Sequence, residues 1–228
     1  MSGLSNTQAL LSFIREKRIE PGDRLPSERM LAGKLSVSRN SLREAVAVLS
    51  NLRVLDVRPN SGVYLRHVAN ESSFEQMVLQ SSLGGAPSSQ EILDTMEVRI
   101  PLETQALRLA CERRDETDLD AIKLILIDER AALSRGENTV QFDQAFHLRV
   151  VAAAHNSVLL RLLNSFYQLT LVRRERFFAN PDRARESARD HRRILKAIER
   201  QDADEATRLV TIHMQRARLY WSLINIAS

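Results

Sequence analysis

Residues 21–43, which read PGDRLPSERMLAGKLSVSRNSLR, limit what this chain can fold into more than any other segment does. The letters PGD are a turn signal, and Ser27 stands where its side chain can cap a helix that continues through Lys34. The letters SVS then interrupt the helical pattern, and the second of these serines, Ser38, can cap another helix. The segment therefore predicts two short helices joined by a tight connection, as in a helix-turn-helix.

Apolar residues recur at helical spacing in both predicted helices, so one face of each is expected to be buried. These residues are Met30, Leu31 and Leu35 in the first helix and Leu42, Val46 and Leu49 in the second. Polar side chains gather near the N-terminal end of the second helix, namely Arg39, Asn40, Ser41 and Arg43. Because such side chains reach base edges and phosphates, this helix is predicted to read DNA.

Residues 54–66 predict a small β-hairpin after the two helices. Residues 54–58 and 63–66 have the composition of strands, and the letters PNSG between them form a turn. A hairpin in this position would be the wing of a winged helix-turn-helix.

Residues 1–68 differ from the rest of the chain in their charge. Residues 1–68 hold 11 lysines and arginines against 6 acidic residues, whereas residues 69–228 hold 22 against 23. Helix pairs with exposed arginines also occur in proteins that do not bind DNA, so the motif alone leaves both interpretations open. A basic small domain beside a nearly neutral larger one favours DNA binding, because basic side chains neutralise phosphates.

The stretch LPSERMLAGKLSVSRNSLREAV resembles the winged helix-turn-helix of the GntR family of bacterial transcription regulators. The resemblance implies that this domain binds double-stranded DNA, with the tip of the wing in the minor groove. The implied DNA-binding residues are Arg29, Ser38, Arg39, Asn40, Ser41, Arg43, Ser61 and Gly62. Two features depart from the family: Ser36 stands where a glycine is usual in the turn, and the wing is less rich in glycine.

The remaining chain divides into a linker and a helical domain. Residues 69–89 are expected to be a linker, which can form a short helix over residues 71–83 before the letters GGAPSS break it. Beyond it only helical periodicity is found, and glycine is absent after Gly136. The expected helices run to about residue 114 and over residues 116–135, 140–154, 157–178, 183–200 and 203–226.

The fold is therefore predicted to be mainly α. A winged helix-turn-helix with a small β-hairpin occupies residues 1–68, and an all-α bundle of about six helices occupies residues 90–228. Cys111 is the only cysteine, so no intramolecular disulfide can form, and its helical surroundings predict a buried side chain.

One carboxylate and three imidazoles form a candidate metal site inside the predicted bundle. Asp143 and His147 are four residues apart, so they lie on the same face of one helix. His191 and His213 lie on two later helices among apolar neighbours, so both can point into the bundle. This donor set suits a divalent transition metal, with zinc foremost and nickel, manganese, iron or cobalt as alternatives.

The same residues allow a plainer interpretation. Asp143 and His147 could be an ion pair on a helix surface, and the other histidines could be hydrogen-bonded core residues. His155 lies eight residues beyond His147 at a helix end and is expected to be structural. His67 follows the wing, where a solvated loop residue is expected.

Residues 90–228 resemble the FCD domain, the all-helical effector-binding domain of the FadR subfamily of the GntR family. The motif consists of FDQAFH, a DH pair ending at His191, and TIHMQRA; an aspartate replaces the more usual glutamate before His191. The resemblance implies that the four-residue metal site lies at the floor of a pocket for small organic acids. It also implies that Arg99 pairs with an effector carboxylate, although a surface pair with Glu103 is an equal alternative.

A basic cluster in the bundle is expected to lie mostly on a solvated face. Arg173, Arg174 and Arg176 are close neighbours and cannot all face inward. One of the three could still line the pocket.

We therefore expect a cytoplasmic transcription regulator without a membrane partner, because no leader sequence and no long apolar run is found. A homodimer is expected to hold a pseudo-palindromic operator of a carbon or organic-acid operon, most simply as a repressor that a metal-bound acid controls. An enzyme is not expected, because no second acidic cluster for a two-metal site is evident. Two alternatives stay open: a metal-free regulator that responds to an acyl thioester, and a metal-dependent hydrolase.

Overall fold

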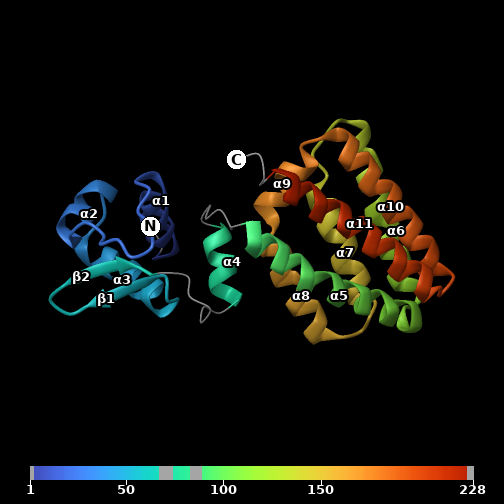
Figure 1. Cartoon of the computed structure of the whole chain (residues 1–228), viewed down its shortest axis with the longest axis horizontal. Coiled ribbons are helices and arrows are strands. Elements are labelled where there is room, and N and C mark those ends of the chain that lie inside the picture. Colours follow the sequence, from blue (N-terminus) through green and yellow to red (C-terminus); the bar gives the residue numbers. More distant parts are fainter. Residues whose placement is uncertain (1–2, 67–73, 83–88, 225–228) are drawn as a thin grey trace. The chain divides into compact units, whose positions relative to one another are not determined.

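The computed structural model describes residues 3–66, 74–82 and 89–224, and the chain divides into two compact units, Met1–Gly85 and Ala86–Ser228. His67 lies outside the described residues, as do the ends of the helix expected over residues 71–83. The described part of that segment is one helix, α4 (Phe74–Ser82). Figure 1 shows the helices and strands of both units.

The first unit contains α4 and, before it in the sequence, a cluster of three helices with a two-stranded hairpin. Its elements before α4 are α1 (Gly3–Glu16), α2 (Glu28–Leu35), α3 (Arg39–Asn51), β1 (Leu55–Arg58) and β2 (Gly62–Leu65). The strands pair antiparallel with Leu55 opposite Leu65, and Arg24 forms an isolated bridge to Tyr64 beside them. Helix α1, which the sequence reasoning did not identify, packs on α3 and buries Leu10 and Ile14 in the core of this unit.

Serine side chains start the two helices of the motif, as the sequence predicts. Ser27 Oγ accepts a hydrogen bond from the Met30 amide at 3.4 Å, and Ser38 Oγ accepts one from the Ser41 amide at 3.1 Å. The expectation that Met30 is buried is wrong, because its exposed fraction is 51%. Met30 lies about 100° around the helix from Leu31, so an eight-residue helix that buries Leu31 turns Met30 toward solvent.

The second unit is a bundle of helices, and the predicted mainly α fold with a small hairpin is confirmed. Its described elements are α5 (Ser89–Arg113), α6 (Glu116–Ser134), α7 (Val140–Ala152), α8 (Ser157–Leu169), α9 (Leu171–Phe178), α10 (Pro181–Glu199) and α11 (Ala203–Ile224). The helix predicted over residues 157–178 is two helices, which meet at Thr170. The Thr170 hydroxyl donates to the Phe166 carbonyl at 2.8 Å, a side-chain bond that competes with the helical pattern.

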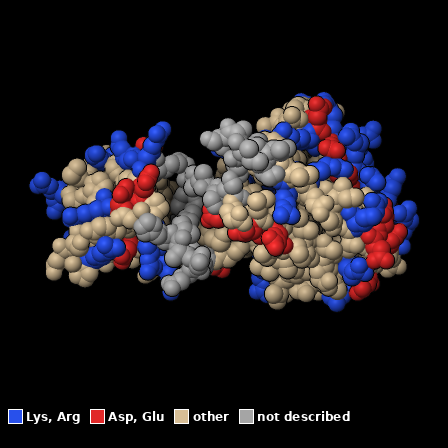
Figure 2. Space-filling view, in the orientation of Figure 1, with Lys and Arg blue, Asp and Glu red and all other residues tan. Residues whose placement is uncertain are grey.

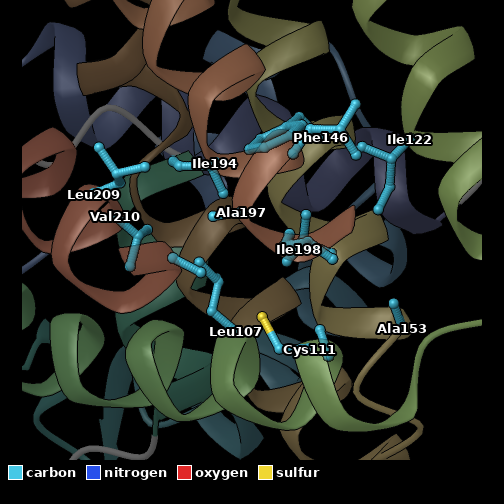
Figure 3. Close-up of a cluster of buried hydrophobic side chains, with 14 of the residues drawn as sticks. Leu107, Cys111, Ile122, Phe146, Ala153, Ile194, Ala197, Ile198, Leu209 and Val210 are labelled. Carbon is cyan, nitrogen blue, oxygen red and sulfur yellow. The ribbon is translucent and has the colours of Figure 1, made fainter. Parts of the chain in front are cut away.

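The helices that carry the candidate metal residues pack around the hydrophobic core of this unit. Figure 3 shows apolar side chains from α5, α6, α7, α10 and α11 packed around Ile194 and Ile198. Cys111 is buried among them, as predicted, and burial raises the pKa of its thiol to about 11. The Phe146 ring stacks on His191 with centroids 4.2 Å apart, so core packing fixes the orientation of one imidazole of the site.

None of the helices in the described part of the chain is both long enough and apolar enough to cross a membrane.

Replacing Ser36 by glycine should stabilise the first unit. Ser36 ends α2 in the left-handed region, with φ 54°, where glycine avoids the steric cost that a side chain brings. We expect Ser36→Gly to raise the local free energy of unfolding by about 0.5–1 kcal/mol, which slows amide exchange in α2 and α3 about two- to fivefold. Hydrogen exchange read by mass spectrometry on peptides from these helices measures this.

Ala47→Gly is the control, because Ala47 is an exposed residue in the interior of α3 with ordinary helical backbone. Glycine in a helix interior is unfavourable, so this variant should speed exchange in the same peptides. Faster exchange in Ser36→Gly as well would show that the left-handed turn is not a strained position.

Candidate functional site

Four polar residues from three helices converge inside the bundle. Asp143 and His147 lie one turn apart on α7, His191 lies on α10 and His213 on α11. Each offers one donor atom, and these atoms all lie within 4.8 Å of one another. Asp143, His147 and His191 are at most 4% exposed, so the alternative of an ion pair on a helix surface is wrong.

The donor atoms of this Asp143 cluster are spaced as the ligands of one metal ion would be. His147 Nε2 lies 3.2 Å from His213 Nε2. Asp143 Oδ1 lies 3.8, 3.5 and 4.0 Å from the Nε2 atoms of His147, His191 and His213, respectively. Ligands bound to one zinc ion at roughly 2.0–2.2 Å lie about 3–4 Å from each other. The cluster therefore fits a divalent transition metal without rearrangement of its helices.

Each imidazole has a carboxylate behind it. The pairs formed by the opposite ring nitrogen, Nδ1, are His147 with Glu103 Oε2 at 3.4 Å, His191 with Glu129 Oε1 at 3.0 Å, and His213 with Asp190 Oδ2 at 3.4 Å. A carboxylate in this position fixes the ring and leaves Nε2 as the ligand atom, which is the usual arrangement around metal-binding histidines. Three such pairs around one centre are difficult to explain as ordinary core histidines.

The pKa shifts in the site follow from the same contacts. Burial lowers the pKa of His213 to about 4, despite the hydrogen bond with Asp190, so this imidazole is neutral near pH 7. Burial would also lower the pKa of His191, but Glu129 and Asp143 outweigh it and raise the value to about 9. For Asp143, burial is outweighed by the neighbouring histidines and Arg174, which hold its pKa well below the usual range. The carboxylate of the cluster is therefore ionised.

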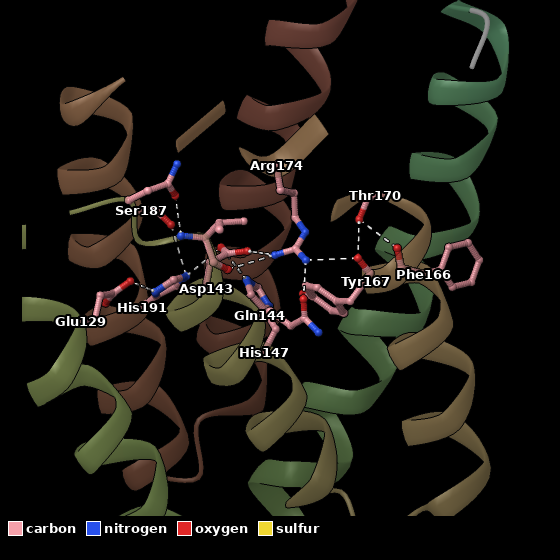
Figure 4. Close-up of polar contacts among 12 residues, drawn as sticks. Glu129, Asp143, Gln144, His147, Phe166, Tyr167, Thr170, Arg174, Ser187 and His191 are labelled. Atoms are coloured by element: carbon pink, nitrogen blue, oxygen red, sulfur yellow. Dashed lines mark hydrogen bonds and ion pairs between the residues drawn. The ribbon is translucent and has the colours of Figure 1, made fainter. Parts of the chain in front are cut away.

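Arg174 ties the outer oxygen of Asp143 to the surrounding helices. Its Nη1 donates to Asp143 Oδ2 at 3.1 Å, and its Nη2 donates to Gln144 Oε1 at 2.7 Å and to the Tyr167 carbonyl at 3.1 Å (Figure 4). Oδ1 of Asp143 therefore faces the imidazoles of the cluster, and Oδ2 accepts the hydrogen bond from the Arg174 guanidinium. The expectation that Arg174 lies on a solvated face is wrong, because this buried carboxylate needs a cation.

A cavity opens beside the Asp143 cluster. Its empty volume, including the part open to solvent, is about 680 Å³, and Asp143, His147 and His213 lie on its wall. The other lining residues include apolar side chains, such as Met96 and Trp221, and several arginines. A cavity with apolar walls and a few convergent charges is typical of a small-molecule site.

Arg99 lines this cavity and also pairs with Glu103, which is the alternative that the sequence left open. It is 5% exposed, and its Nη2 donates to Glu103 Oε1 at 3.1 Å. Its guanidinium lies 4.0 Å from the centre of the Tyr167 ring. The pair is therefore buried, not on the surface, and Arg99 reaches His147 through Glu103.

Arg173 also lines the cavity, which corrects the expectation that it lies on a solvated face. It is 8% exposed, whereas Leu171 and Val172, the first two residues of α9, are exposed. Arg176, farther along α9, is exposed as expected.

The predicted DNA-binding residues lie in the first unit at the start of α3 and near it. Arg29, Arg39 and Asn40 are exposed, while Arg43 Nε donates to Glu28 Oε2 at 2.8 Å. Ser38 and Ser41 bind each other through their hydroxyls at 2.9 Å, so both serve the helix start. Figure 2 shows lysine and arginine side chains over the visible face of this unit.

The wing carries the other two predicted residues. The Ser61 hydroxyl lies 2.7 Å from the Tyr64 hydroxyl, and Gly62 adopts φ 126°, which few side chains tolerate. A Cβ atom on Gly62 would come within 2.7 Å of Arg24 Nε. Arg24 is a residue that the sequence reasoning missed, and it lies across the wing because Gly62 has no side chain.

His155, which the sequence predicts to be structural, forms an ion pair away from the Asp143 cluster. His155 Nε2 lies 2.9 Å from Asp118 Oδ2, and Arg149 donates to Asp118 Oδ1 at 3.1 Å. Asp118 also accepts from the Asp115 amide at the start of α6. Both oxygens of Asp118 are thus used in joining α6 to the end of α7.

Sequence reasoning missed Glu103 as a site residue and did not identify Glu129 at all. Glu103 was considered only as a surface partner of Arg99, and Glu129 stands 62 residues from His191, its hydrogen-bond partner. No local spacing connects such pairs. Asp190 belongs to the predicted motif, but its pairing with His213, 23 residues away, was not predicted.

Comparison with known proteins assigns both units. Residues 7–65 match the family described as bacterial regulatory proteins, gntR family, and residues 94–216 match the FCD domain. An Escherichia coli (strain K12) protein assigned to regulation of the L-lactate dehydrogenase operon is 32% identical over 208 residues, covering 89% of this chain and 80% of that protein.

Two further comparisons extend over nearly the whole chain. The HTH-type transcriptional regulator LutR of Bacillus subtilis (strain 168) is 28% identical over 207 residues, covering 89% of this chain and 93% of LutR. The solved structure of Lar, which controls the expression of the Listeria monocytogenes agr system, shares the fold with a TM-score of 0.73 at 15% identity. It covers 97% of this chain and 96% of the other.

Removing one ligand of the Asp143 cluster should abolish stable metal binding. We expect the purified chain, loaded with zinc and dialysed, to retain one ion per chain, and His191→Ala to retain almost none. Glu129→Gln should weaken zinc binding by about 10- to 100-fold, because this carboxylate only orients His191. Inductively coupled plasma mass spectrometry and competition with a chelator measure both effects.

His155→Ala is the control, since His155 belongs with Asp115 and Asp118 to a separate, more exposed group of possible ligands and not to the Asp143 cluster. It should retain the wild-type zinc content. A full zinc content in His191→Ala would exclude this residue as a ligand, and an equal loss in the control would point to binding elsewhere.

Proposed function

The chain belongs to the GntR family of bacterial regulatory proteins and carries an FCD domain, and from this premise we propose what it binds and how it is controlled. It is a transcription regulator. We place it in the FadR subfamily and propose that a homodimer binds a pseudo-palindromic operator and represses a carbon or organic-acid operon. The relatives named above regulate transcription, and one of them is assigned to a lactate operon.

DNA binding is proposed to centre on the N-terminal end of α3. Arg39 and Asn40 are exposed there, and their functional groups suit guanine and adenine edges in the major groove. Arg29 and Arg43 would contact phosphates, with Ser38 and Ser41 fixing the helix start. Two further residues, Ser61 and Gly62, place the wing at the minor groove.

The helical unit is proposed to hold a divalent transition metal and a small organic acid. The observation that supports this most directly is the convergence of the Asp143 cluster with a cavity lined by buried arginines. The metal, with zinc foremost among the candidates, would supply a positive centre for a carboxylate. Arg99 would take part in holding that acid, since it lines the same cavity.

Charged walls argue against the acyl-thioester alternative. A long acyl chain needs an apolar tunnel, whereas Arg99, Arg173 and Arg174 all border this cavity. Binding of an acid is proposed to shift the population between conformations that bind the operator and those that do not.

Replacing Arg39 by alanine should weaken binding to the operator. Loss of a bidentate base contact costs about 1–3 kcal/mol, so affinity should fall about 5- to 150-fold, with reduced discrimination at one base position. The operator is first obtained by selection from random duplexes with the wild-type protein. Fluorescence anisotropy with that duplex and with scrambled duplexes then measures affinity and specificity.

Arg192→Ala is the matched control, because Arg192 is an exposed arginine of α10 in the other unit. It removes the same charge and should leave operator affinity unchanged. If Arg39→Ala bound the operator as tightly and as selectively as the control, α3 would not be the reading helix.

A further inference from the structure

We infer that the acid bound in the cavity carries two anionic groups and that Arg173 receives the second one. The inference rests on the proposed effector site and names the class of its ligand, a small dicarboxylate. It is carried by the one lining arginine that lacks a partner among the described residues.

Five arginines line the cavity, and four of them have partners on the protein. The partners are Glu103 for Arg99 at 3.1 Å, Asp143 for Arg174 at 3.1 Å, Glu186 for Arg216 at 3.2 Å, and the Tyr220 ring for Arg183 at 3.6 Å. The Arg173 guanidinium forms no ion pair with the described residues. Of the five, it is therefore the cation without an ion-pair or ring partner in the described part of the chain, and the charge of Glu91 offsets its own only in part.

Because Arg173 is buried, the lack of an ion-pair partner among the described residues is energetically unfavourable. The residue is 8% exposed, and its Nη1 is buried without a hydrogen-bond partner in the described part of the chain. Burial and the positive charge of Arg99 outweigh the negative charge of Glu91 and lower the pKa of Arg173 to about 10, so it is still a cation near pH 7. Buried charges are normally paired, because an unpaired one loses its hydration without compensation. An anion from outside the chain would supply the missing pair.

The Asp143 cluster and Arg173 border the same cavity, so one small ligand can meet both. A divalent ion at the cluster brings positive charge of its own, in addition to that of Arg173. A single carboxylate would leave one of these centres without an anion, whereas a dianion matches both. Apolar side chains also line the cavity, including Met96 and Phe177, and they suit a short carbon skeleton.

A matched pair of acids tests the inference on the wild-type protein. L-malate and 2-hydroxybutyrate share a 2-hydroxy acid end and a four-carbon skeleton, but only malate has a distal carboxylate. Isothermal titration calorimetry on the full-length, zinc-loaded protein should give an affinity for malate about 10- to 100-fold above that for 2-hydroxybutyrate, the effect of one charge-assisted contact.

A variant tests whether Arg173 causes the difference in affinity between malate and 2-hydroxybutyrate. Arg173→Gln should lose the preference for malate while it keeps the affinity for 2-hydroxybutyrate. Without ligand its melting temperature should equal or exceed that of the wild type, because an unpaired buried charge is removed. Arg176→Gln, which changes an exposed arginine of the same helix, should keep the wild-type preference.

The outcomes separate this inference from the proposed function. If both acids bind equally well to the wild type, the effector site stands and the second anion site is wrong. If 3-phosphoglycerate binds and malate does not, Arg173 receives a phosphate and the dicarboxylate class is wrong. If none of these acids binds in either the zinc-loaded or the stripped protein, the proposed effector site fails and this inference fails with it.

Discussion

The buried Asp143 carboxylate is the group on which the arrangement of the helical unit depends. It lies at 4% exposure with three imidazole nitrogens on one side and the Arg174 guanidinium on the other. A carboxylate in this environment stays ionised because two neighbouring histidines and Arg174 outweigh its burial, and these partners come from α7, α10 and α9. The helices therefore converge on one charge, and a metal ion would complete the set of partners.

Three further carboxylates lie behind the imidazoles of the Asp143 cluster. Glu103, Glu129 and Asp190 each hold one imidazole, and Glu103 also pairs with Arg99 and accepts from the Tyr167 hydroxyl at 2.7 Å. The cavity wall and the Asp143 cluster are thus joined through shared side chains. A ligand that draws Arg99 away from Glu103 would change the support of His147, which gives a physical route from effector binding to the helices.

The fold and the four cluster residues could be predicted from sequence because their signals are local. The spacing of Asp143 and His147 is one helical turn, and the start of α3 is written in Ser38 and the polar residues after it. Interactions between distant segments could not be predicted in this way. The burial of Arg174 against Asp143 and the role of Glu129 both depend on contacts between helices far apart in sequence.

The most direct test of the account is to titrate L-malate into the complex of the protein with its selected operator, once with zinc-loaded protein and once after chelator treatment. Fluorescence anisotropy of the labelled duplex reports how much operator stays bound. The account predicts that malate changes operator affinity only when zinc is present, because the Asp143 cluster and the acid act as one site. An equal response of the stripped protein, or no response of either form, would contradict it.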